Sequence, residues 1–546
     1  MLKKITITAL ALMLPVFAMA QDIESLIRSM TLRQKIAQII IISVDTHDSP
    51  QRREAQKQLV AQGLGGLIVM DDPLGPCIQM VNELQEGAAI PMLVSIDGEW
   101  GASMRFYEFA AFPKAMQLGA LPSEELVYQA GVAIGEELSA IKIFANYAPD
   151  TDVNNNPANP VIGVRSFGED RQKVAAYGSA YMRGMQSAGV AGCAKHFPGH
   201  GDTEVDSHKG LPVLNLDRSR LDSLELYPFR RMIADGVEMV MIGHLSVPAL
   251  DPTGTPASIS TPIVTGLLKE EMGFKGIVIT DALGMKGVSN DYGDASVAAY
   301  KAGADILLMP QDGGKTIDSL EALFLSGSLD ESVLDAKVAK MLSFKKKCGM
   351  LSEDYSPYVD PYKALKASYR PETEALIQRI CDESQTVLQG SFPLDAGKTA
   401  YVAVNALSEE SAEFFLELCK EHFPCDRFFL DGDATPAEIA ALKEKLRGYD
   451  RVIVGFHSGK PIGRTGGPRR EASAEKDFFE SIVSWTSDIN VYGIWFGNPY
   501  ALAALPSYKA FKGFIVSYSD TSFNNRAAAR AITRGSAKGI LPVIIN

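Results

Sequence analysis

The most restrictive feature of this sequence is a regular alternation of short apolar runs and helical stretches between residue 21 and about residue 350. Eight of the runs are rich in β-branched or other apolar residues and have the length of buried strands. They cover residues 39–45, 65–70, 92–97, 143–150, 190–197, 237–244, 276–281 and 304–310. Eight β-then-α units predict a TIM (β/α)8 barrel with inserted loops. A doubly wound open sheet is the alternative, disfavoured because no glycine-rich phosphate-binding turn follows the first run.

Polar residues gather where these runs end. Those at or just past the end of a run are Asp97, Asp150, Lys195, His196, His244 and Asp281. In a (β/α)8 barrel the carboxyl ends of all strands meet on one face, which is where such barrels carry their active sites. The pattern therefore predicts a site at this face.

A chain of 546 residues is too long for one ordinary hydrophobic core, so two large domains are expected. After the barrel at 21–350, prolines and tyrosines followed by a helical stretch predict a linker over residues 351–390. A second strand-and-helix alternation then predicts a smaller α/β sandwich domain over residues 391–546. Its strand-like runs are residues 399–405, 450–457, 488–499 and 511–519.

The first 20 residues have the pattern of a cleavable secretory signal. Lys3 and Lys4 precede an apolar run from residue 5 to residue 17, and Ala-Met-Ala closes the segment at residues 18–20. The run is too short to span a bilayer, and the small residues favour cleavage after Ala20. No later segment is long and apolar enough to cross a membrane. We therefore expect an exported protein, periplasmic or secreted.

The net charge limits the kinds of partner. The formal charge is −13, and it is two units more negative without Lys3 and Lys4. Such a chain repels nucleic acid and anionic membrane surfaces, so a neutral or locally recognised substrate fits better. The six cysteines show no CxxC spacing, and buried free thiols are at least as consistent with them as disulfides. No feature of the sequence specifies an oligomeric state.

The stretch KHFPGHGDTEVDSHKGLP, residues 195–212, holds three of the seven histidines. A zinc site is disfavoured, because Pro198 and Gly199 break the helix that an HxxxH pair would need. A serine or cysteine nucleophile is disfavoured as well, because neither Cys193 nor Ser207 has the sequence context of an activated nucleophile. The Gly-Gly-Lys-Thr segment at residues 313–316 lacks the first glycine of a P-loop.

Proton transfer fits the stretch better. In an extended segment Asp206 and His208 lie on the same side, where the carboxylate can hydrogen-bond the imidazole and favour its protonated form. Such an imidazole can donate and recover a proton near neutral pH. Gly199 and Gly201 would allow the loop to move over a substrate, and a capped surface turn is the alternative.

The same stretch resembles, position by position, the K-H-F-x-G-H-G-x4-D-S-H signature of the β-N-acetylglucosaminidase (NagZ-like) branch of glycoside hydrolase family 3. Similar segments are IDGEWGASMRF at 96–106, FPKAMQLGA at 112–120, the segment at 146–170 and GIVITDALGMKGV at 276–288. Together they cover most of residues 30–345. The second domain resembles the two-domain members more loosely, and since the dyad is present we expect that domain to be catalytically dispensable.

The resemblance implies a role for several residues. Asp281 takes the place of the nucleophile of a retaining β-glycosidase, His208 that of the acid/base, and Asp206 that of its orienting partner. The residues in sugar-binding positions are Asp97, Arg105, Arg165, Lys195 and His196. No metal and no cofactor is implied. Trp100 departs from the family pattern, which has glycine there, and it could narrow or stack against a subsite.

The expected function is that of an exported retaining exo-β-N-acetylglucosaminidase (β-N-acetylhexosaminidase). It would remove terminal GlcNAc from peptidoglycan-derived or related glycans through a covalent intermediate on Asp281. The alternatives on the same fold are a GlcNAc phosphorylase and a β-glucosidase or β-xylosidase. A non-catalytic glycan-binding protein is a further alternative, which an intact Asp281 and His208 disfavour.

Overall fold

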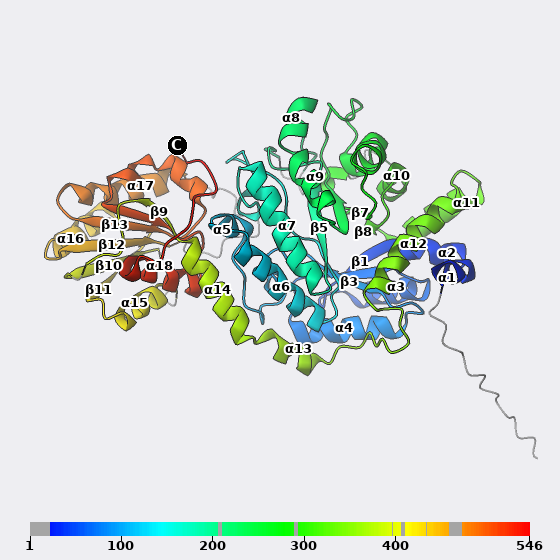
Figure 1. Cartoon of the computed structure of the whole chain (residues 1–546), viewed down its shortest axis with the longest axis horizontal. Coiled ribbons are helices and arrows are strands. Elements are labelled where there is room, and N and C mark those ends of the chain that lie inside the picture. Colours follow the sequence, from blue (N-terminus) through cyan, green and yellow to red (C-terminus); the bar gives the residue numbers. More distant parts are fainter. Residues whose placement is uncertain are drawn as a thin grey trace, which may run out of the picture.

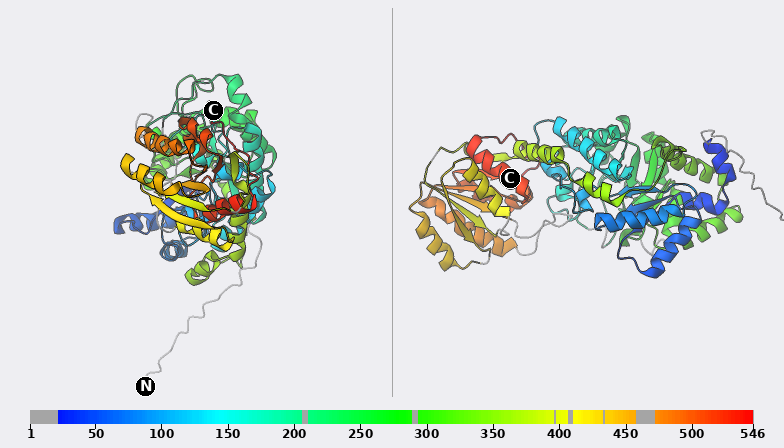
Figure 2. Two further views of the ribbon diagram at one scale, coloured as in Figure 1. Left: turned by 90° about the vertical axis from the view of Figure 1, so that its left-hand side faces the viewer. Right: turned by 90° about the horizontal axis from the view of Figure 1, so that it is seen from below.

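The computed structural model describes residues 22–205, 210–288, 293–395, 397–405, 410–432, 434–457 and 472–545. In these ranges the chain forms an eight-stranded sheet and a six-stranded sheet. The two sheets belong to two bodies that lie side by side along the longest axis of the molecule (Figures 1 and 2). The predicted barrel followed by a second α/β domain is confirmed.

The first sheet is a nearly closed parallel barrel. Its strands are β1 (Ile40–Val44), β2 (Gly66–Val69), β3 (Leu93–Ile96), β4 (Ala145–Asn146), β5 (Ala191–Phe197), β6 (Met239–Ile242), β7 (Ile277–Thr280) and β8 (Leu307–Leu308). From β1 to β7 each strand pairs with the next one in sequence, and β1 also pairs with β8. A parallel bridge between Ile279 and Ile306 brings β7 to β8 and completes the ring. All eight predicted runs contain one of these strands.

Both faces of these strands are buried, which explains their continuous apolar sequence. At least one residue from each strand joins a single interior cluster, among them Ile41, Ile68, Leu93, Ala145, Cys193, Met239, Ile277 and Leu308. The alternate residues, such as Ile40 and Ile42, belong to the cluster beneath the surrounding helices. The barrel centre is therefore filled, and its polar chemistry is restricted to the rim.

Two helices precede the first strand, and the others that surround the barrel lie between or after the strands. They are α1 (Ile23–Ser29), α2 (Leu32–Gln38), α3 (Pro50–Ala61), α4 (Leu74–Glu86), α5 (Ala115–Gly119), α6 (Glu125–Ala140), α7 (Arg171–Ser187), α8 (Arg218–Ser223), α9 (Leu226–Ala234), the π-helix η4 (Pro262–Glu271), α10 (Ala295–Ala302), α11 (Gly313–Leu325) and α12 (Glu331–Lys347). Several begin at an aspartate whose carboxylate accepts N–H groups of the first turn, among them Asp170, Asp294 and Asp330. Sequence and structure therefore agree on where these helices start.

The second domain is a sheet between two helical layers. Its strands are β9 (Thr386–Gln389), β10 (Thr399–Val404), β11 (Cys425–Leu430), β12 (Arg451–Phe456), β13 (Val491–Trp495) and β14 (Gly513–Val516), in the order β11-β10-β12-β13-β14-β9. Alternate strand residues pack against α16 (Pro436–Leu446) and α17 (Ala472–Val483) on one face, and against α15 (Glu410–Lys420) and α18 (Ser522–Arg534) on the other. The predicted sandwich is thus present, with a doubly wound parallel sheet and one antiparallel edge strand, β9.

Two strands of this sheet were not predicted. β9 lies within the segment 351–390, together with α13 (Pro361–Ser368) and α14 (Pro371–Ser384). β11 reads CDRFFL, in which charged residues interrupt the apolar pattern. Both are edge strands with partly exposed side chains, so neither has the continuous apolar run of a central strand. The proposed domain and linker boundaries stay predictions.

Other predictions concern the thiols and the membrane. All six cysteines lie in the described ranges and are free thiols. Among the helices of the described ranges, none is long and apolar enough to cross a membrane. Residues 1–20 lie outside those ranges, so the secretory signal stays a prediction.

Helices α6 and α7 approach each other at glycines. A Cβ added at Gly131 would lie 2.2 Å from the Tyr181 carbonyl oxygen, and one added at Gly184 would lie 2.3 Å from the Tyr128 carbonyl oxygen. Both obstacles are backbone atoms, which no rotamer change can remove. The two helices can pack this closely only because these positions lack side chains.

We predict that Gly131→Ala lowers the free energy of unfolding by about 1–3 kcal/mol, because the helices must separate to admit the methyl group. Urea denaturation followed by circular dichroism measures the change. Gly75→Ala is the matched control, since Gly75 lies in α4 and a Cβ there has no neighbour within 4 Å. Equal stability of the two variants would contradict the predicted close contact.

Candidate active site

The polar residues predicted at the strand ends lie together at the carboxyl-terminal rim of the barrel. Asp97 directly follows β3, and Asp281 directly follows β7. Lys195 and His196 are part of β5. The Asp281 N–H donates to the Ile242 carbonyl at 2.9 Å, so the end of β7 is fixed to β6.

Lys195 is the centre of a buried charge network. Its Nζ lies 2.9 Å from Asp97 Oδ1 and 2.8 Å from Glu99 Oε1, and its side chain is only 2% exposed. Arg105 approaches Asp97 as well, with 3.1 Å between Nη2 and Oδ2. Burial by itself would raise the pKa of Asp97, but Lys195 and Arg105 outweigh burial and lower that pKa. Asp97 is therefore an ionised carboxylate between two cations.

Arg165 is held by Glu99, which the sequence-based prediction did not include. Arg165 ends the 3-10 helix η2 (Gly163–Arg165), and its Nε and Nη2 donate to the two Glu99 oxygens at 2.9 and 2.7 Å. Burial would raise the pKa of Glu99, but Arg165 and Lys195 keep it well below its ordinary value. Glu99 thus joins two of the predicted sugar-binding cations. Its position two residues after Asp97, within the family-like segment at 96–106, was the signal in the sequence.

His196 is oriented by two contacts. Its Nδ1 lies 2.8 Å from Asp152 Oδ2, and its Nε2 lies 3.3 Å from Nη2 of Arg165. A guanidinium can only donate, so Nε2 accepts and Nδ1–H donates to Asp152. Burial would raise the pKa of Asp152, and the hydrogen bond from His196 reverses this and lowers it. Asp152 therefore sets the tautomer of His196, a role that the sequence did not predict.

Asp281 and His244 are both hydrogen-bonded to the backbone of Ala282. Asp281 Oδ1 accepts the Ala282 N–H at 2.7 Å, while His244 Nε2 donates to the Ala282 carbonyl at 2.9 Å. Ser258 Oγ lies 2.7 Å from the other ring nitrogen of His244. Burial would raise the pKa of Asp281, but the positive charge that His244 can carry and the Ala282 N–H lower it. Asp281 is therefore held as an ionised carboxylate.

Two groups in the described ranges bring three potential metal ligands together. In the first, Asp150, Asp152 and His196, the guanidinium of Arg165 already supplies a positive charge 3.5 Å from Asp150 Oδ2. Since His196 Nδ1 also donates its proton to Asp152, this nitrogen has no lone pair to offer a metal ion.

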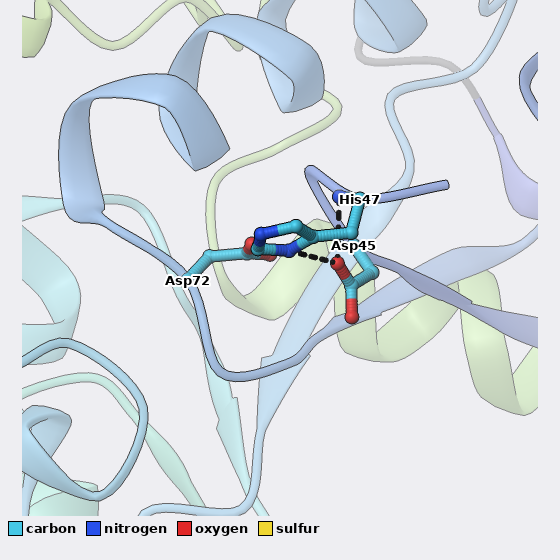
Figure 3. A group of neighbouring side chains, drawn as sticks. All are labelled: Asp45, His47 and Asp72. Atoms are coloured by element: carbon cyan, nitrogen blue, oxygen red, sulfur yellow. Dashed lines mark hydrogen bonds and ion pairs between the residues drawn. The ribbon is translucent and has the colours of Figure 1, made fainter. Parts of the chain in front are cut away.

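The second group, Asp45, His47 and Asp72, lies on the loops after β1 and β2 (Figure 3). His47 Nδ1 lies 3.0 Å from Asp45 Oδ1 and 3.7 Å from Asp72 Oδ1. Asp72 accepts the Thr46 N–H with both oxygens. The His47 ring is 81% exposed, and these contacts fix two loops to each other. We assign no metal site to either group.

The Glycosyl hydrolase family 3 N terminal domain matches residues 31–344, which is more than half of the chain. The chain belongs to glycosyl hydrolase family 3. The family predicted from the motifs is thereby confirmed.

Two curated relatives match about half of the chain. A Beta-hexosaminidase A of Pseudoalteromonas piscicida is 39% identical over 273 residues, which cover 45% of this chain and 46% of the relative. A Beta-N-acetylglucosaminidase/beta-glucosidase of Cellulomonas fimi is 30% identical over 298 residues, covering 53% of each protein. The chain thus spans about half the length of these two relatives.

A solved structure matches over both domains. It is a glycoside hydrolase family 3 beta-N-acetylglucosaminidase from Paenibacillus sp. str. FPU-7, with 32% sequence identity and a TM-score of 0.78. The superposition covers 95% of this chain and 99% of that one. The two-domain architecture is therefore shared with this family 3 structure.

The predicted acid/base pair of this family 3 protein, Asp206 and His208, lies outside the described residues. The start of their loop is described and is tightly held. The His200 N–H donates to Asp152 Oδ1 at 2.7 Å, and a Cβ added at Gly201 would lie 1.9 Å from the Val153 carbonyl oxygen. The glycine at 201 is therefore required by close packing. The roles of Asp206 and His208 stay predictions.

Trp100, the departure from the family pattern, lies beside the charge network. The Lys114 ammonium is 4.7 Å from the centre of the Trp100 ring, a cation–π contact. Burial lowers the pKa of Lys114 to about 8. Glu99 and Arg165 also act electrostatically on Lys114, so this contact lies close to the network.

We predict that Glu99→Gln lowers the free energy of unfolding by about 3 kcal/mol, because it leaves Lys195 and Arg165 buried with one carboxylate fewer. Urea denaturation at pH 7 measures the loss. Glu124→Gln is the control, since the Glu124 side chain is 51% exposed and its contact with Arg183 at 3.9 Å contributes little. A loss no greater than that of the control would show that the network does not depend on Glu99.

Proposed function

We propose that this protein is an exported retaining exo-β-N-acetylglucosaminidase that hydrolyses terminal β-GlcNAc from peptidoglycan-derived or related glycans. One observation carries the proposal: an ionised, partly buried Asp281 lies on the same barrel rim as the network of Asp97, Lys195 and Arg165. A nucleophile and a polar sugar-binding surface are the two parts that a retaining glycosidase needs. The names of the relatives agree with the GlcNAc specificity.

The nucleophile is Asp281. Its Oδ1 accepts a hydrogen bond from the Ala282 N–H, which fixes the carboxylate, and the carboxylate attacks the anomeric carbon of the sugar. As the new C–O bond forms, the glycosidic C–O bond breaks and the leaving oxygen takes a proton from His208. Neutral His208 then removes a proton from water, which attacks the same carbon and releases Asp281.

The sugar is held by the charge network. The Asp97 carboxylate accepts hydroxyl hydrogens, and Lys195 and Arg165 donate to hydroxyl oxygens. Because Glu99 and Asp97 already hold these cations, the donors need little reorganisation when the substrate arrives. Contacts of this kind accelerate the reaction where they strengthen in the transition state.

The acid/base pair rests on sequence and on the fixed start of its loop. His208 would carry the proton, and Asp206 would orient the imidazole and raise its pKa. An imidazole repels an incoming phosphate less than a carboxylate would, so phosphorolysis is the closest alternative. Export rests on the predicted secretory signal at residues 1–20.

The function is tested with 4-nitrophenyl β-glycosides of GlcNAc, glucose and xylose, each with and without inorganic phosphate. We expect the GlcNAc substrate to have the highest kcat/KM, with free GlcNAc as the product in both buffers. GlcNAc 1-phosphate as the main product would instead identify a phosphorylase, and faster cleavage of glucose or xylose would reassign the substrate. Binding without turnover of any glycoside would indicate a glycan-binding protein.

We predict that Asp281→Asn lowers kcat for the aryl GlcNAc by about 10⁴-fold, because an amide cannot form the glycosyl-enzyme. Release of 4-nitrophenol measures the rate. Asp202→Asn is the control, since Asp202 also lies near this rim but contacts Arg220 at 3.6 Å. Near-normal turnover by Asp281→Asn would remove Asp281 from the nucleophile's role.

The role of His208 as the acid can be tested independently of the role of Asp281 as the nucleophile. His208→Ala should lower kcat/KM for methyl β-GlcNAc by about 10²–10⁴-fold, because the methoxide leaving group needs a proton. The decrease in kcat/KM should be smaller for the aryl GlcNAc, since nitrophenolate leaves without needing a proton. His47→Ala is the control, because His47 is exposed and touches only loop carboxylates. Equal losses with both substrates would contradict an acid role.

A further inference from the structure

We infer that Tyr500, in the second domain, is a positioning residue for the active site on the barrel. It holds the barrel loop of residues 150–168, which presents Arg165 and supports the start of the loop that leads to His208. The inference rests on the proposed function for its kinetic test. It also differs from the expectation that the second domain is catalytically dispensable.

Tyr500 makes two hydrogen bonds to one residue of the barrel. It lies in the 3-10 helix η7 (Pro499–Ala504), and it is 7% exposed. Its hydroxyl donates to the Asn154 carbonyl oxygen at 2.5 Å and accepts from Asn154 Nδ2 at 3.0 Å. Both the backbone and the side chain of Asn154 are therefore fixed by a group from the other domain.

Asn154 in turn fixes the turn that carries Arg165. Its Oδ1 accepts the Gly163 N–H at 3.1 Å, and Gly163 begins η2, which ends at Arg165. The Asn154 N–H donates to the Gly168 carbonyl at 3.1 Å, which joins the two ends of the segment from Asn154 to Gly168. Rotation of the Asn154 amide would release η2, and with it the guanidinium that contacts Glu99.

The same loop supports the start of the predicted acid/base loop. The Val153 carbonyl lies so close to Gly201 that a Cβ there would be 1.9 Å away. Asn159 Nδ2 donates to the carbonyls of His200 and Gly201 at 2.8 and 2.9 Å. Displacement of residues 153–159 therefore moves both the sugar-binding guanidinium and the base of the loop that carries His208.

The second domain is itself anchored, so Tyr500 is a fixed support. The Tyr500 N–H donates to Asn498 Oδ1 at 3.0 Å. Further along the chain, the Ile540 N–H donates to the Ala120 carbonyl at 2.8 Å, and the Glu169 N–H donates to the Pro542 carbonyl at 3.1 Å. The second domain contacts the side of the barrel that carries α5 and α7 (Figure 1). These contacts make the second domain a support for the site even if it supplies no reacting group.

The test compares Tyr500→Phe with Tyr401→Phe. Tyr401 is fully buried, and its hydroxyl lies 2.6 Å from His457 Nε2 inside the second domain, so the control loses the same group without touching the barrel. We expect Tyr500→Phe to lower kcat/KM for the aryl GlcNAc about 5- to 50-fold, mostly through KM, since Arg165 holds the sugar. The decrease in kcat/KM should be larger for the methyl glycoside than for the aryl glycoside, because the base of the His208 loop moves as well.

Asn154→Ala extends the test as a double-mutant cycle. If Tyr500 acts through Asn154, the fold-decrease in kcat/KM of the double variant should be clearly smaller than the product of the fold-decreases of the two single variants. Multiplicative losses would overturn the proposed route through Asn154. Kinetic constants for Tyr500→Phe equal to those of Tyr401→Phe, in a protein whose wild type is active, would overturn the positioning role itself.

Hydrogen exchange of the intact protein gives a readout that does not depend on activity. Amides of residues 154–168 should exchange faster in Tyr500→Phe and unchanged in Tyr401→Phe, because the Gly163 N–H loses its fixed acceptor. If the wild type cleaves no glycoside, the proposed function fails, and this measurement still decides the contact. Unchanged exchange in Tyr500→Phe would overturn the inference.

Discussion

The interaction on which the site depends is the buried ion pair of Lys195 with Asp97 and Glu99. A lysine that is 2% exposed keeps its positive charge here because two carboxylates, at 2.9 and 2.8 Å, compensate it. The contact joins the ends of β3 and β5, whose side chains are 98 residues apart in the chain. It therefore fixes the shape of the rim before any substrate is present.

Charge compensation continues from this pair across the rim. Glu99 also holds Arg165, whose guanidinium in turn leaves His196 Nε2 only the role of an acceptor. Asp281 stays ionised beside these groups without a direct salt bridge among the contacts of the described residues. An ionised carboxylate that is not paired with a cation is suited to nucleophilic attack. A carboxylate that is paired with two cations, as Asp97 is, is suited to binding hydroxyl groups.

The second domain contributes to the site through hydrogen bonds rather than through charged groups. Its sheet has a core of its own, and its contribution to the rim is made by Tyr500 on the loop around Asn154. A domain can thus be needed for the geometry of a site without touching the substrate. The distinction is between a group that reacts and a group that keeps another in place, and only kinetics with matched variants can separate the two.

The sequence by itself determined the barrel, because strands buried on both faces must be continuous apolar runs, and it placed Asp97, Lys195 and Asp281 at their ends. It missed the edge strands β9 and β11, whose exposed faces break that pattern. Only the tertiary structure decided that Glu99 compensates Lys195 and that Tyr500 meets the barrel. Those pairings join residues far apart in the chain, and a local pattern carries no information about which distant groups folding brings within hydrogen-bonding distance.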